Sequence, residues 1–124
     1  MYEWGSATCR AAVFAAAAAS IVPSNDAAAS GRDLTRAVYD YAVTSYCGTL
    51  TPAVEAGFRK ELAALTARAG LDAEAARRLR IRGWVEADRE WSNRGLGGHR
   101  AWCEEEGLPA AYHFWEIAKG IKQP

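Results

Sequence analysis

Apolar residues recur at helical spacing through residues 31–47. Leu34, Val38 and Tyr41 lie three or four positions apart, so they share one face of a helix. Ser30 precedes the stretch and is a residue type that caps helix N-termini. The pattern therefore predicts an amphipathic helix over 31–47 that begins just after Ser30.

Two further helices are predicted from the residues that bound them. Thr51 stands before Pro52, a pair typical of a helix start, and Gly70 is a residue type that ends helices. Asp72 then begins a third helix, which is expected to run over 73–93.

The third predicted helix carries two apolar lines. One line consists of small residues around Gly83, which would let another helix approach closely. The bulkier line contains Ile81, Trp84, Val85 and Trp91. A helix that is apolar on two lines is expected to lie centrally and to contact two partners.

A glycine-rich turn at 94–98 precedes two shorter helices. The first covers 99–106 and is expected to stop at Gly107, and the last begins beside Pro109 with Phe114 on its apolar face. No segment alternates between apolar and polar residues long enough to predict a strand. The predicted fold class is all-α, a compact bundle of about four to five short helices.

The N-terminal residues follow a different pattern. Arg10 precedes an apolar run over 11–22, and small residues follow it up to Ala29. This order is typical of a secretory signal peptide, and the run is shorter than the ~20 residues of a membrane-spanning helix. We predict a cleaved signal peptide over 1–29, a single domain over 30–124, a periplasmic or secreted location and no stable membrane anchor. The alternative is an alanine-rich helix inside a cytoplasmic protein.

Export would also account for an odd number of cysteines. The sequence has three, and Cys9 lies within the predicted signal peptide. In an oxidising compartment the remaining pair, Cys47 and Cys103, is expected to form a disulfide. Closing so long a loop would stabilise the fold by roughly 4 kcal/mol. The alternatives are free thiols, or a metal site in which Cys47 and Cys103 join His99 and His113 as ligands.

Charge and motifs exclude several classes of function. Lys plus Arg number 15 and Asp plus Glu number 15, and this balance argues against a dedicated nucleic-acid binder. The sequence contains no phosphate-binding loop, nucleophile elbow or metalloprotease motif, so we expect neither an enzyme nor a bound cofactor. The least favoured hypothesis is an enzyme that uses Glu86 and Glu90 for acid–base chemistry, because they share one helix face.

Tryptophans are dense in the predicted domain. They either fill the core or form, with arginines, an exposed patch for a partner. We expect a small exported protein that binds another exported protein, as an inhibitor, an immunity-type factor or an accessory subunit. The candidate contact residues are Trp84, Arg89, Trp91, Arg94 and Arg100. The alternative is a helical protein that binds a small ligand, a metal or haem.

Overall fold

The computed structural model describes residues 25–124, which form an all-α bundle with one disulfide and, within that range, no strand. The elements are α1 (Asn25–Tyr46), α2 (Pro52–Ala69), α3 (Ala73–Ser92), α4 (Gly98–Trp102), the π-helical turn η1 (Cys103–Gly107) and α5 (Leu108–Ala118). The fold class predicted from the hydrophobic pattern is confirmed.

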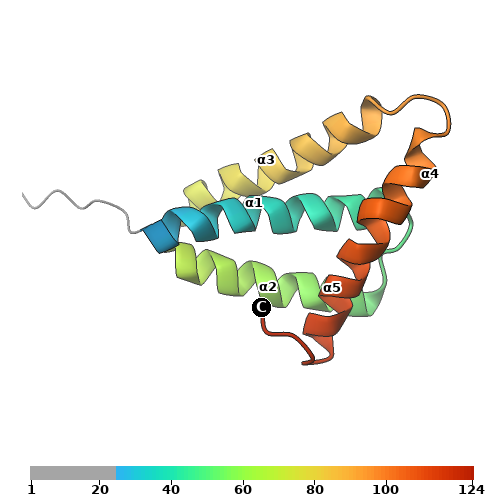
Figure 1. Ribbon diagram of the computed structural model, residues 1–124. Helices are drawn as coiled ribbons and strands as arrows, with labels where there is room; N and C mark the ends of the chain where they lie inside the picture. Colours follow the sequence, from blue (N-terminus) through green and yellow to red (C-terminus); the bar gives the residue numbers. More distant parts are fainter. Residues whose placement is uncertain (1–24) are drawn as a thin grey trace, which may run out of the picture.

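Helix α1 lies at the centre of the bundle. Figure 1 shows it between α3 on one side and α2 on the other, while α5 crosses one end of the bundle and packs on α2. Among the described elements, α3 packs closely along its length against α1 alone. The prediction that α3 lies centrally is wrong, because its line of small residues packs on α1 whereas Ile81, Trp84 and Val85 of the bulkier line stay exposed. Trp91, the last residue of that line, packs against neighbouring aromatic rings.

The contact between α1 and α3 depends on the absence of a side chain at Gly83. A β-carbon built on Gly83 would lie 2.7 Å from the carbonyl oxygen of Thr35 and 2.8 Å from the β-carbon of Val38. Ala76, two turns before Gly83, and Ala87, one turn after it, are buried on the same face. The expected close approach of another helix is therefore confirmed, and that helix is α1.

The predicted helix boundaries hold where local hydrogen bonds set them. The Thr51 hydroxyl accepts a hydrogen bond from the Val54 N–H at 3.2 Å. The Asp72 carboxylate accepts one from the Ala75 N–H at 2.7 Å, and Gly70 ends α2 in the left-handed conformation at φ 60°. These three residues begin and end the helices as predicted.

Helix α1 begins at Asn25, earlier than predicted. Ser30 lies inside the helix rather than at its N-cap, because the preceding alanines are strong helix formers that extend it. Residues 1–24, with most of the predicted signal peptide, lie outside the described residues. The predicted cleavage position after Ala29 falls within α1 and stays a prediction. Over 25–124, no helix combines the length and apolar character needed to cross a membrane.

Gly107 does not end a helix, which corrects the sequence-based prediction. Its backbone is right-handed helical (φ −67°, ψ −47°), and α4, η1 and α5 continue into one another without a loop. The Leu108 N–H donates to the Cys103 carbonyl, five residues earlier, which is the wider π-helical spacing. The glycine is required instead by a close contact with Cys47.

Candidate functional site

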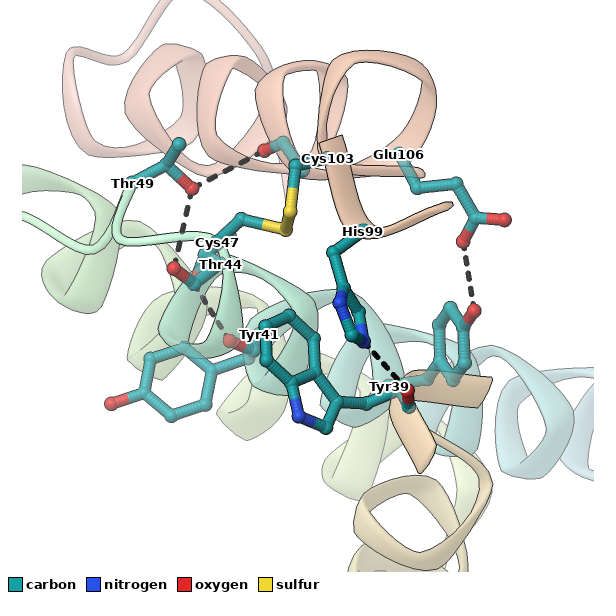
Figure 2. The surroundings of a disulfide bond; sticks show 10 residues. Tyr39, Tyr41, Thr44, Cys47, Thr49, His99, Cys103 and Glu106 are labelled. Atoms are coloured by element: carbon teal, nitrogen blue, oxygen red, sulfur yellow. Dashed lines mark hydrogen bonds between the residues drawn. A yellow bond between two sulfur atoms is a disulfide. The ribbon is translucent and has the colours of Figure 1, made fainter. Parts of the chain in front are cut away.

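The predicted disulfide between Cys47 and Cys103 is present. It joins the end of α1 to the start of η1, with the two α-carbons 5.4 Å apart. Figure 2 shows the Thr49 hydroxyl beside it, within hydrogen-bond distance of the carbonyl oxygens of Thr44 (3.3 Å) and Gly107 (3.4 Å). The bridge and this hydroxyl together fasten the end of α1 to the C-terminal helical segment. A disulfide is typical of proteins in an oxidising environment.

The alternative metal site is not assembled by its four proposed ligands. Both cysteine sulfurs are bonded to each other, so neither is available as a thiolate. His99 Nε2 lies 2.9 Å from the Trp91 carbonyl oxygen, and His113 bonds elsewhere in the bundle. Among residues 25–124, no group of three or more His, Cys, Asp or Glu is placed to hold a metal ion.

Two of the predicted contact residues are engaged in packing at the C-terminal end of α3. Trp91 lies between the rings of Tyr46 (centroids 5.1 Å apart) and His99 (3.9 Å). The Arg94 guanidinium lies over the fully buried ring of Trp102, 5.1 Å from its centroid. These contacts make Trp91 and Arg94 part of the structural framework.

The other three predicted contact residues lie on separate surfaces. Trp84 is 39% exposed and stands edge-on to the rings of Tyr41 and Tyr46. Arg89 lies on the flank of α3 opposite to Trp84, where it faces α1. Arg100, on α4, is exposed and pairs with Glu104 at 3.1 Å. The structure therefore does not bring the five residues together on one face.

Trp84 belongs instead to an exposed patch on the bulkier apolar line of α3, which was expected to contact another helix. Ile81 and Val85 are 47% and 49% exposed and lie three residues before and one residue after Trp84. We call these three residues the apolar strip. Residues three and four apart are neighbours on a helix surface, so the strip is continuous.

A charged cleft of about 590 Å³ lies between α1 and α3. We call it the arginine cleft, and its lining residues are Arg32, Thr35, Arg36, Tyr39, Arg82, Glu86, Arg89 and Glu90. It contains both carboxylates of the enzyme hypothesis. Glu86 lies 4.0 Å from Arg82, and Glu90 pairs with Arg94 at 2.8 Å, and both glutamates are exposed. This is the arrangement of a solvated, ion-paired helix face.

Tyr39 also lines this cleft, although no pattern in the sequence points to it. Its hydroxyl donates a hydrogen bond to Glu106 at 2.8 Å (Figure 2). Burial and this bond raise the pKa of Tyr39 from 10.0 to about 12. Beside it, Arg36 bonds Asp40 at 2.9 Å and lies 3.8 Å from Glu106. Burial raises the pKa of Asp40, although the charge of Arg36 opposes the shift.

A second polar cluster, also not predicted, joins α2, α5 and the C-terminal residues. His113 Nε2 lies 2.9 Å from both carboxylate oxygens of Glu61. The Lys122 ammonium donates to Nδ1 of the same ring at 2.9 Å. A lysine ammonium can only donate, so Nδ1 is the acceptor and the ring proton is on Nε2. The Nε2–H then donates a hydrogen bond to the Glu61 carboxylate. The cluster ties the end of the chain to α2.

Comparison with known proteins adds no assignment. No protein-family model, curated protein or solved structure matches the chain. The apolar strip and the arginine cleft are accordingly judged by their geometry and chemistry. They lie on different flanks of α3, since the strip is exposed beside Tyr41 and the cleft faces the side of α1 that carries Tyr39.

Proposed function

We propose that this protein is exported and binds another exported protein through the apolar strip on α3. The observation that carries the proposal is the exposure of three adjacent apolar side chains on a helix that packs closely only on α1. Single exposed apolar residues are ordinary on protein surfaces, whereas a contiguous apolar patch with a polar rim is typical of interaction sites.

The surroundings of Trp84 support a role as the central contact. Its ring is oriented by edge contacts with Tyr41 and Tyr46, at 6.0 and 6.5 Å between centroids. Tryptophan is enriched among the residues that dominate interface energetics, and a pre-oriented side chain loses less entropy on binding. Arg77 and Arg80, each four residues before a member of the strip, supply a charged rim.

Export is supported by two independent features. The Cys47–Cys103 disulfide is of the kind that persists in oxidising compartments. The apolar run over 11–22, with its flanking residues, is typical of a signal peptide. Together they favour a periplasmic or secreted protein that acts as an inhibitor, an immunity-type factor or an accessory subunit.

The partner can be sought with a photo-crosslinking amino acid placed at position 85 in cells that make the protein. The matched control carries the crosslinker at position 112 on α5, where Tyr112 is also exposed. We expect a crosslinked partner of defined mass from position 85 alone. Crosslinking from both positions to the same set of proteins, or only to a second copy of the chain, would count against the proposal.

Affinity for the crosslinked partner then tests the strip itself. Ile81→Ser combined with Val85→Ser removes two exposed side chains that lie outside the buried core. We expect about a ten-fold or greater loss of affinity, since losing about 1 kcal/mol at each of the two contacts together exceeds the roughly 1.4 kcal/mol of a ten-fold change. The control, Leu108→Ser with Tyr112→Ser, removes exposed apolar surface from α5 and should change affinity less than about two-fold. Equal losses in the two variants would contradict the assignment of the surface.

A further inference from the structure

We propose that the arginine cleft binds a small oxyanion, a molecule that carries phosphate or carboxylate groups. The cleft is distinct from the apolar strip, and this inference does not depend on the proposed function. Four of its lining residues are arginines and two are glutamates, so positive charge is in excess. The chain as a whole has no net charge, so the local excess of positive charge arises because the fold brings these arginines together.

Two of the cleft arginines have no carboxylate partner. Elsewhere the chain pairs arginines with carboxylates four residues away, as in Arg59, Arg78, Arg94 and Arg100. Within the part of the chain that the structure describes, no carboxylate oxygen lies within 4.0 Å of the guanidinium of Arg32 or Arg89. Arg82 reaches Glu86 only at 4.0 Å. An anion in the cleft would therefore meet guanidinium groups that are not already neutralised.

The two walls of the cleft are regular helix faces. Helix α1 contributes Arg32, Thr35, Arg36 and Tyr39, and α3 contributes Arg82, Glu86, Arg89 and Glu90. The contact of Gly83 with Thr35 holds the two backbones together, so arginines from both helices surround one space. Binding groups on packed helices are held in place more firmly than groups on loops.

The chemistry of the lining limits the ligand. The planar guanidinium group offers paired N–H donors that match the oxygens of a phosphate or a carboxylate. Tyr39 and Glu90 are already bonded to Glu106 and Arg94. Arg36 is paired with Asp40. The arginines left to contact the ligand are Arg32, Arg82 and Arg89. These come from both walls, so a ligand with two anionic groups fits best. The cleft volume of about 590 Å³ falls within the roughly 300–1,000 Å³ typical of small-molecule sites.

Backbone amide NMR titration of the purified, disulfide-bonded protein tests this inference. The probes are inorganic pyrophosphate and succinate, added at constant ionic strength because exposed charges are screened by salt. We expect saturable shifts at the residues that line the cleft. The double variant Arg32→Ala with Arg89→Ala should weaken binding about ten-fold or more, as expected for the loss of charge-assisted hydrogen bonds.

The matched control is Arg77→Ala with Arg78→Ala, which removes two exposed arginines of α3 outside the cleft. It should change affinity by less than about two-fold. Saturation with one probe alone supports the inference and identifies the anionic group. Shifts that rise without saturation with both probes, or equal weakening in the two double variants, would overturn it, since either result indicates attraction to arginines in general.

Discussion

Gly107 lies directly against Cys47, one of the two cysteines of the disulfide. A β-carbon built on Gly107 would lie 2.9 Å from both the β-carbon and the sulfur of Cys47, and 3.6 Å from the β-carbon of Cys103. The missing side chain lets η1 approach the end of α1 closely enough for the bridge to form. This explains a buried glycine in a segment with ordinary helical dihedral angles.

Gly107→Ala is expected to destabilise the protein by about 1–3 kcal/mol, because the methyl group overlaps the disulfide and must displace it. Urea unfolding under non-reducing conditions measures the change. The control is Gly95→Ala, since Gly95 has open space around its α-carbon and no positive φ. It should leave stability almost unchanged. Equal effects of the two substitutions would show that Gly107 makes no close contact.

Removing the disulfide is expected to lower the free energy of unfolding by about 4 kcal/mol, given the 56-residue separation of its cysteines. The variant is Cys47→Ser with Cys103→Ser, and its denaturant midpoint is compared with that of the oxidised wild type. The reduced wild type should unfold close to the variant. A variant as stable as the oxidised protein would mean that the bridge adds no stability.

The mature protein isolated from its own cells should have the mass of residues 30–124 less two hydrogens. This result requires both cleavage after Ala29 and oxidation of Cys47 and Cys103. Intact mass spectrometry, with and without reduction, reads the two changes separately. A mass that corresponds to all 124 residues would exclude the predicted signal peptide.

Tyr39→Phe is expected to cost about 1–2 kcal/mol at neutral pH, because it removes a hydrogen bond to the Glu106 carboxylate. The pKa of Tyr39 is raised from 10.0 to about 12 by burial and by this bond. Its contribution to stability is therefore complete below pH 10 and is lost as the pH rises through about 12. The stability difference between wild type and variant should shrink over this range. A difference that stays constant there would contradict the role given to the hydroxyl.

Asp40→Asn tests the raised pKa of a half-buried carboxyl. Burial raises the pKa of Asp40 above its ordinary value of 3.8, although Arg36 opposes the shift. The stability that this group contributes is thus present below pH 3.8 and is lost as the pH rises through its folded-state pKa. Relative to wild type, the variant should become more stable as the pH rises through that window. Asp33→Asn, at an exposed position of α1, shows whether the effect depends on burial.

The helix ends that the sequence predicts correctly are those that local contacts determine. Thr51 and Asp72 each accept a hydrogen bond from an N–H three residues later, and Gly70 adopts the left-handed conformation that glycine favours. Each of these depends on only a few consecutive residues. The same is true of the helical periodicity that identified the fold class.

The predictions that failed depend on contacts between distant residues. Glycine is needed at position 107 because of Cys47, which lies far away in the sequence just after the end of α1, whereas the local rule assigned Gly107 to a helix end. Helical periodicity places Ile81 and Trp84 on one side of the helix but does not show whether another helix covers them. In the structure none does. The presence of Arg32 and Arg89 in one cleft likewise follows from the packing of α1 on α3 at Gly83 and has no sequence motif.

The Cys47–Cys103 bond closes a covalent ring that contains all of α2, α3 and α4. The segment 93–97, where Leu96 is fully exposed, lies within this ring. Exposed turns of small and polar residues are the preferred sites of protease cleavage. A single cut there would open the ring without dividing the molecule, because the two pieces remain joined through sulfur. A protein built in this way keeps its mass, apart from one added water, until the bond is reduced.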